Sequence, residues 1–161
     1  MKKSLFITQS AVIAALYVAL TLVSNFLGLA NGAIQLRISE AMTILPVFMP
    51  SAIPGLFIGC LISNLITDGV LLNIIGGSLA TLIGAIGTRL LRKNYTLATL
   101  PPILANTVIV PFIIMYAYGA EGTYWYFALT VFIGEAISAG VLGVVLARAL
   151  SKHKNLFDKY I

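Results

Sequence analysis

Long apolar stretches separated by short polar intervals run through the whole chain. Charged residues are absent from positions 4–36, 41–67, 69–88 and 94–120, and only Glu135 interrupts residues 122–147. Because about 20 apolar residues of helix cross a hydrocarbon core of ~30 Å, these windows predict membrane spans. We expect six spans, at residues 5–29, 38–48, 53–67, 71–91, 100–118 and 124–150. The pattern predicts an all-α membrane protein, a six-helix bundle forming one integral membrane domain over residues 1–161.

The second expected span is short because prolines interrupt the stretch from residue 37 to residue 68. Pro46, Pro50 and Pro54 make a single straight helix across residues 37–68 improbable, since proline disfavours helical geometry in the residue before it. Cytoplasmic segments are enriched in Lys and Arg. With six crossings, one side of the membrane receives every cation except Arg37, namely Lys2, Lys3, Arg89, Arg92, Lys93, Arg148, Lys152, Lys154 and Lys159. We therefore expect a plasma-membrane protein with both termini cytoplasmic and with the loops around Asn31, Asp68 and Glu121 outside.

Composition narrows the function classes. The chain is 60% apolar and 9% charged, whereas a soluble domain carries about a quarter charged residues. Five acids, a single histidine in the tail and a lone cysteine offer no catalytic or metal-binding cluster, and a phosphate-binding loop for ATP is absent from the sequence. The basic residues behind the net charge of +5 lie beside apolar runs, which favours lipid headgroups over nucleic acid as their binding partner. We expect neither enzymatic activity nor a cofactor.

Polar residues inside the apolar sequence are the candidate site. Glu135 is flanked by 13 uncharged residues before it and 12 after it, and intramembrane acids usually face a cavity or a partner. Gln35, Arg37 and Glu40 gather donors and acceptors at the outer end of a short helix, which suits either a lid or a surface ion pair. Further candidates for binding are Asn64, Asn106 and Trp125, although Trp125 also suits a simple interfacial anchor.

Small residues recur at four-residue spacing on several expected spans. Such rows let helix backbones approach closely in lipid, and most of them suit packing inside the bundle. The first span carries the most uniform row, which consists of Ala11, Ala15 and Ala19. We expect this row to face a partner helix.

Three segments resemble a known family. They are AIQLRISEAMTILPVFMPSAIPGLFIGCLISNLI (33–66), GGSLATLIGAIGTRLLRK (76–93) and PPILAN (101–106). They are similar to the QueT family, the substrate-binding S components of energy-coupling factor (ECF) transporters assigned to queuosine precursors. The first-span alanines also resemble the motif by which S components dock on a transmembrane coupling subunit.

The resemblance implies a six-helix subunit that captures its ligand outside and works with a coupling protein and two cytoplasmic ATPases. A deazaguanine ligand presents adjacent N–H donors that a carboxylate such as Glu135 or Glu40 accepts, and a carbonyl that Asn106, Gln35 or Arg37 can bind. Trp125 would stack on its ring. Three alternatives stay open: an S component for another small vitamin or nucleobase-like ligand, a non-transport membrane assembly protein, and a membrane enzyme acting on lipid-linked substrates.

Overall fold

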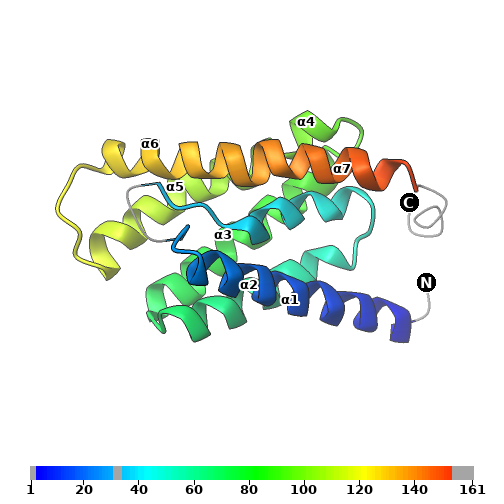
Figure 1. The fold of residues 1–161 in the computed structure, drawn as a ribbon, viewed down its shortest axis with the longest axis horizontal. Coiled ribbons are helices and arrows are strands. Elements are labelled where there is room, and N and C mark those ends of the chain that lie inside the picture. The colour runs from blue at the N-terminus through cyan, green and yellow to red at the C-terminus, as the bar shows by residue number, and fades with distance from the viewer. Residues whose placement is uncertain (1–2, 31–33, 154–161) are drawn as a thin grey trace.

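Helices are the only regular secondary structure in the residues described by the computed structural model, 3–30 and 34–153 (Figure 1). The helices in chain order are α1 (Lys3–Phe26), the 3-10 helix η1 (Ile38–Val47), α2 (Ala52–Thr67), α3 (Leu71–Leu90), α4 (Tyr95–Ala98), α5 (Leu100–Ala117), α6 (Tyr124–Glu135), the π-helix η2 (Ala136–Leu142) and α7 (Gly143–Ser151). Both ends of the described chain lie at the same end of the molecule.

The distribution of side chains is that of a protein surrounded by lipid. Four segments, Lys3–Phe26, Leu71–Leu90, Tyr95–Ala117 and Tyr124–Ser151, are long and apolar enough to cross a membrane. Their outer faces expose large apolar side chains such as Ile7, Ile83 and Val145, whereas many Ser, Thr and Asn side chains are buried inside. In lipid, apolar side chains can stay exposed on the protein surface, while polar groups need hydrogen-bond partners within the protein. The chain is therefore a helical membrane protein.

The 3-10 helix η1 is the central element of the bundle. It packs against α1, α2, α3, α4, η2 and α7, and eight of its ten residues are buried. The sequence predicted a helix here but did not predict the 3-10 geometry. Ten residues rise about 20 Å as a 3-10 helix and about 15 Å as an α-helix, so the tighter winding lengthens a short segment. The Arg89 side chain caps the C-terminal end of η1 by donating hydrogen bonds to the carbonyls of Pro46 and Val47 at 3.0 and 3.2 Å.

The longer helices pack on one another in sequence order, with α1 on α2, α2 on α3, α3 on α5 and α5 on α6. The contact of α3 with α5 depends on a glycine, since a Cβ at Gly84 would lie 2.7 Å from the Cα of Pro102. Rows of small residues on α2, α3 and η2–α7 are largely buried, as internal packing requires. Ala11, Ala15 and Ala19 differ, because all three are exposed on the surface of α1.

Two local features differ from the sequence prediction. The short helix α4, capped by the Asn94 side chain, lies in what was expected to be a plain loop between two spans. The last expected span, residues 124–150, is helical throughout but changes to π geometry directly after Glu135. A π turn inserts an extra residue into the helix and commonly marks a functional position. The expected outer loop at Asn31 lies outside the described residues.

Candidate ligand-binding site

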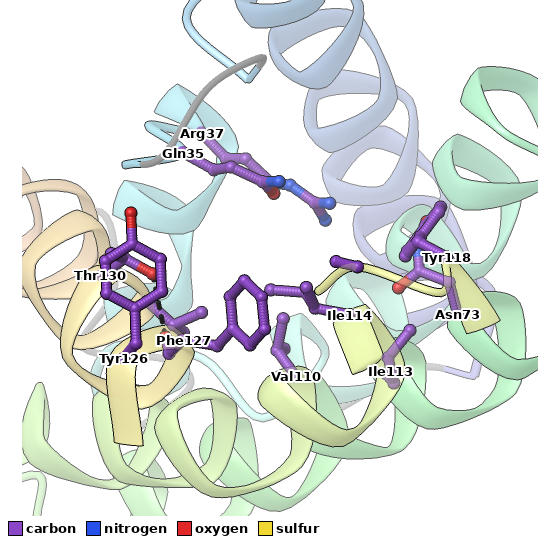
Figure 2. Close-up of a pocket in the computed structure, with 12 residues that line it drawn as sticks. Gln35, Arg37, Asn73, Val110, Ile113, Ile114, Tyr118, Tyr126, Phe127 and Thr130 are labelled. Atoms are coloured by element: carbon purple, nitrogen blue, oxygen red, sulfur yellow. Dashed lines mark hydrogen bonds between the residues drawn. The ribbon is translucent and has the colours of Figure 1, made fainter. Parts of the chain in front are cut away.

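A cavity opens at the end of the molecule remote from the two described termini (Figures 1 and 2). Its outer chamber has a volume of about 300 Å³, at the lower end of the range for small-molecule sites. Figure 2 shows Gln35 and Arg37 reaching in from one side, opposite the apolar wall of α5 and the aromatic residues of α6. The lining residues are Gln35, Arg37, Asn73, Val110, Ile113, Ile114, Tyr118, Ala120, Tyr126, Phe127, Thr130 and Val131.

A smaller inner pocket of about 30 Å³, lined by more charged side chains, adjoins this chamber. The two share five lining residues, Gln35, Arg37, Asn73, Val110 and Val131. The inner pocket adds Glu40, Cys60, Gly77, Thr81, Asn106 and Glu135. Both acids that the sequence singled out therefore face one space, although 95 positions separate them in the chain.

Glu40 is held rigidly at the buried end of η1. The residue is 3% exposed, and its Oε1 accepts a hydrogen bond from the hydroxyl of Tyr17 on α1. Its other carboxylate oxygen, Oε2, is buried and has no hydrogen-bond partner. A buried acceptor without a donor is costly, because it has lost its water and gained nothing in exchange. Glu40 also lines the inner pocket, so this carboxylate lies beside the space that a ligand would enter.

Glu135 reaches the same pocket from the last residue of α6. Asn106 on α5 lines the same pocket, and Glu135 Oε2 is also buried without a hydrogen-bond partner. Gly134 before it allows the extended segment at Gln35 to pass against α6, since a Cβ there would lie 2.3 Å from the Gln35 carbonyl oxygen. Two carboxylates with one free buried oxygen each therefore converge on the inner pocket.

Arg37 supplies the positive charge of the site. Its Nη1 lies 3.4 Å from Oδ1 of the buried Asn64, so the guanidinium is directed toward α2. Asn64 in turn donates to the Asn73 carbonyl at 3.2 Å. The sequence left open a simple ion pair between Arg37 and Glu40. In the structure Arg37 instead contacts Asn64, and Glu40 accepts a hydrogen bond from Tyr17.

A polar cluster at the mouth of the cavity joins three helices. The Asn73 side chain donates to Asp68 at 2.7 Å, and the Tyr118 hydroxyl donates to the same carboxylate oxygen. Partial burial, together with the hydrogen bond to Asp68, raises the pKa of Tyr118, which lies one residue beyond α5. The phenol therefore remains a hydrogen-bond donor throughout the physiological pH range. This cluster fixes the ends of α2, α3 and α5 around the outer chamber.

The segment that carries the cavity-lining residues Gln35, Arg37 and Glu40 is tied to α1 by polar contacts. Ser24 accepts from the Ile38 backbone N–H at 2.9 Å, and Thr21 donates to Ser39 at 2.8 Å. With the bond from Tyr17 to Glu40, three residues of α1 hold residues 38–40 in place. The buried face of α1 thus positions the site while its opposite face carries the exposed alanines.

The structure brings together most, but not all, of the residues expected from sequence. Gln35, Arg37, Glu40, Asn106 and Glu135 line the cavity, and Asn64 lies behind Arg37. Trp125 lines neither chamber; it is 79% exposed, and its ring packs edge-on against Tyr124.

Among the aromatic residues around the loop between α5 and α6, the sequence singled out Trp125 for stacking and did not indicate Phe127. Tyr126 and Phe127 line the outer chamber, one and two positions beyond Trp125. The neighbours differ because successive helical side chains point about 100° apart, and the apolar sequence around them gave no sign of which face was inward. Tyr17 was also missed, since a tyrosine in an apolar helix usually indicates packing. Its only available signal was its place one turn from Thr21 and two turns from Ser24.

Within residues 3–30 and 34–153, no three His, Cys, Asp or Glu side chains gather in a group that could hold a metal ion. The site instead offers carboxylate and amide acceptors, a guanidinium donor and an aromatic wall. That combination, enclosed by apolar helices, defines a membrane-embedded protein that binds a small polar ligand.

The comparisons with known proteins agree with this class. The chain matches the QueT transporter family over residues 7–152 and belongs to that family. It is 38% identical over 81 residues to a relative from Lactococcus lactis subsp. cremoris (strain MG1363) named queuosine precursor transporter QueT. That alignment covers 50% of this chain and 47% of the relative, so the match spans about half the length of each. No solved structure matches the chain significantly.

Proposed function

We propose that the chain is the substrate-binding S component of an ECF transporter and that it binds a queuosine precursor with a deazaguanine ring. The relative's name and the family membership support the ligand class. The observation that carries the proposal is the pair of buried, unpartnered carboxylate oxygens, Glu40 Oε2 and Glu135 Oε2, facing one cavity. Unpaired acceptors of this kind suit a ligand rich in N–H donors.

The outer chamber fits the rest of such a ligand. Its volume of about 300 Å³ suits a small bicyclic ring, and Phe127 and Tyr126 supply aromatic faces. Gln35 and Arg37 offer donors for a ring carbonyl, and Arg37 does so as a charged group. In this arrangement the segment around residues 35–40 is the polar wall of the site and α6 the aromatic wall.

The S component acts with a transmembrane coupling subunit and two cytoplasmic ATPases, which supply the energy that this chain lacks. All six expected spans, including the short η1 and α2, take part in the bundle, and both termini are cytoplasmic. Ala11, Ala15 and Ala19 form the docking face on α1. Their exposure supports this role, because small side chains on an outer face let a partner helix approach closely.

Mass spectrometry of the small molecule released from purified protein tests the function directly. We expect a deazaguanine, and calorimetric titration with the same compound should show saturable binding. Replacing Glu135 with Gln should weaken that binding about 10- to 100-fold, since a hydrogen bond to a charged group is worth about 1.5–3 kcal/mol. Glu121→Gln, at an exposed loop position, is the matched control and should bind normally.

The outcomes separate the candidates. Release of another vitamin or nucleobase-like compound would indicate an S component of different specificity. A folded protein that neither retains nor binds any such ligand would indicate a membrane assembly protein instead. Equal affinity in Glu135→Gln would remove Glu135 from the site.

A further inference from the structure

Another hollow lies at the end of the molecule where the described chain begins and ends. It has a volume of about 430 Å³ and lies where α4 packs against the segment η2–α7 (Figure 1). We call it the α4–α7 groove, and it shares no lining residue with either chamber of the ligand cavity. The residues that line it are Thr96, Thr99, Ala136, Gly140, Val141, Val144, Val145 and Arg148.

The walls of the α4–α7 groove are apolar and open to the surroundings. Val141 and Val145 line it, and each is 60% exposed. Thr99 at its base is buried, and its hydroxyl already donates to the Thr96 carbonyl at 2.9 Å. In a membrane-spanning helix such exposed apolar faces contact lipid acyl chains. The groove therefore suits a hydrocarbon chain lying along η2 and α7.

One end of the α4–α7 groove is positively charged. Arg148 is the charged residue among those that line it, and its side chain is exposed. Within residues 3–30 and 34–153 its guanidinium has no hydrogen bond and no ion pair. Lys152 follows four positions later at the end of α7, and residues at this spacing are neighbours on one helix face. Two cations thus lie next to each other where the apolar groove ends.

The acids of the described residues lie elsewhere. Glu40 and Glu135 line the ligand cavity. Asp68 belongs to the polar cluster at the cavity mouth, and Glu121 belongs to the loop between α5 and α6, at the opposite end of the molecule (Figure 1). The α4–α7 groove therefore presents an uncompensated positive charge to its surroundings. In the proposed orientation these surroundings are the cytoplasmic leaflet, whose surface is negatively charged.

We propose that the α4–α7 groove binds one anionic phospholipid, whose phosphate contacts Arg148 and Lys152. Its acyl chain lies against Val141, Val144 and Val145. Along the helix the apolar residues come first and the cations follow toward the C-terminal end. Acyl chain and phosphate follow each other in the same order from the bilayer centre to its surface. A guanidinium suits the phosphate because it can donate two parallel hydrogen bonds.

Native mass spectrometry of the purified, full-length protein in detergent tests the proposal. The protein is titrated with phosphatidylglycerol and with phosphatidylcholine of identical acyl chains, without any deazaguanine. We expect phosphatidylglycerol to bind more tightly, with one lipid retained per chain. Arg148→Gln should reduce this preference about 5-fold, as the loss of one cation near an anionic lipid predicts. Lys93→Gln is the matched control, because it removes an exposed cation outside the groove and should preserve the preference.

A second pair of variants tests the apolar part of the groove. Val141→Trp places a large ring where the acyl chain would lie, so retention of both lipids should be lost. Ile83→Trp, on the outer face of α3, should retain them like the wild type. Thermal unfolding shows whether each variant is folded. If Val141→Trp does not fold, the comparison of Arg148→Gln with Lys93→Gln decides alone.

Three results would overturn the proposal. Equal affinity of the wild type for the two lipids would remove the charge recognition. An equal loss of preference in Arg148→Gln and Lys93→Gln would indicate general attraction to the basic end of the molecule. Unchanged lipid binding in Val141→Trp together with lost co-purification of the coupling subunit would assign the groove to a partner helix. None of these results affects the proposed function, since no deazaguanine takes part in the measurement.

Discussion

Tyr17 shows how a single hydroxyl can set the geometry of this site. Its ring is almost fully buried between α1 and the rest of the bundle, and its hydroxyl donates to Glu40 Oε1. In a low-dielectric interior a carboxylate stays in one position only if donors hold it there. Because Tyr17 takes one oxygen, the position of the carboxylate is fixed, and the other oxygen stays buried without a partner in a residue that lines the inner pocket. Tyr17 is a positioning residue, acting through Glu40.

Removal of this hydroxyl in Tyr17→Phe should lower the free energy of unfolding by about 1.5–3 kcal/mol, because Glu40 would lose its donor while remaining buried. Thermal unfolding in detergent measures the change, and ligand affinity should fall as well. Tyr116→Phe, which alters a tyrosine exposed at the surface of α5, is the control and should unfold like the wild type. Unchanged stability and affinity in Tyr17→Phe would mean that other groups hold Glu40.

At the scale of elements, close contacts between helix backbones stabilise the packing of the bundle, a role that the burial of large apolar side chains has in soluble proteins. Lipid tails are as apolar as leucine, so helices associate through backbone proximity and hydrogen bonds. Gly84 gives α3 this proximity to Pro102 on α5, and the side chains of Thr88 and Ser10 donate to carbonyls on neighbouring segments. The cavity persists because the tight contacts are made elsewhere along the same helices.

The α3–α5 contact can be tested with one methyl group. In Gly84→Ala the new Cβ would lie 2.7 Å from the backbone of Pro102, which cannot move freely, so we expect a loss of about 1–3 kcal/mol in unfolding free energy. Gly140→Ala is the matched change, because its Cβ would lie 3.5 Å from Ile103 Cδ1 and 3.9 Å from the Glu135 carbonyl oxygen, which are ordinary contacts. The first variant should unfold at a lower temperature and the second near the wild-type temperature. Equal midpoints would show that α3 and α5 adjust without cost.

At the scale of the whole molecule, α1 has two faces with different tasks. Its buried face holds residues 38–40 through Tyr17, Thr21 and Ser24, and its outer face carries the alanine row. The proposed docking face and the ligand site are therefore on opposite sides of one helix. A partner that binds α1 contacts the element that positions Glu40.

The variant Ala15→Trp should separate docking from ligand binding. A bulky side chain on the small-residue face prevents close approach of a partner helix, yet it points away from the cavity. We expect ligand affinity to stay within a factor of about two, while co-purification with the coupling subunit and ATP-dependent uptake are lost. Leu16→Trp, at the adjacent exposed position, should assemble normally. Loss of ligand binding in Ala15→Trp would instead place the row inside the functional bundle.

The proposed orientation predicts which loops are accessible. In a Cys60→Ala background, a cysteine at Glu121 should react with an impermeant maleimide from outside intact cells. A cysteine at Lys93 should react only after the membrane is permeabilised. Figure 1 places the corresponding segments at opposite ends of the bundle. The reverse labelling pattern would invert the topology.

The sequence by itself determined the helical membrane character, because uninterrupted apolar windows have no other stable arrangement in a bilayer. It also indicated Glu40, Glu135 and Arg37, since charges inside apolar helices are too costly to occur without a role. Only the tertiary structure decided that both acids share one pocket, that Tyr17 holds one of them, and that Phe127 rather than Trp125 lines the cavity. Those facts depend on helix rotation and on the 3-10 winding of η1, which are set by contacts between segments distant in the sequence.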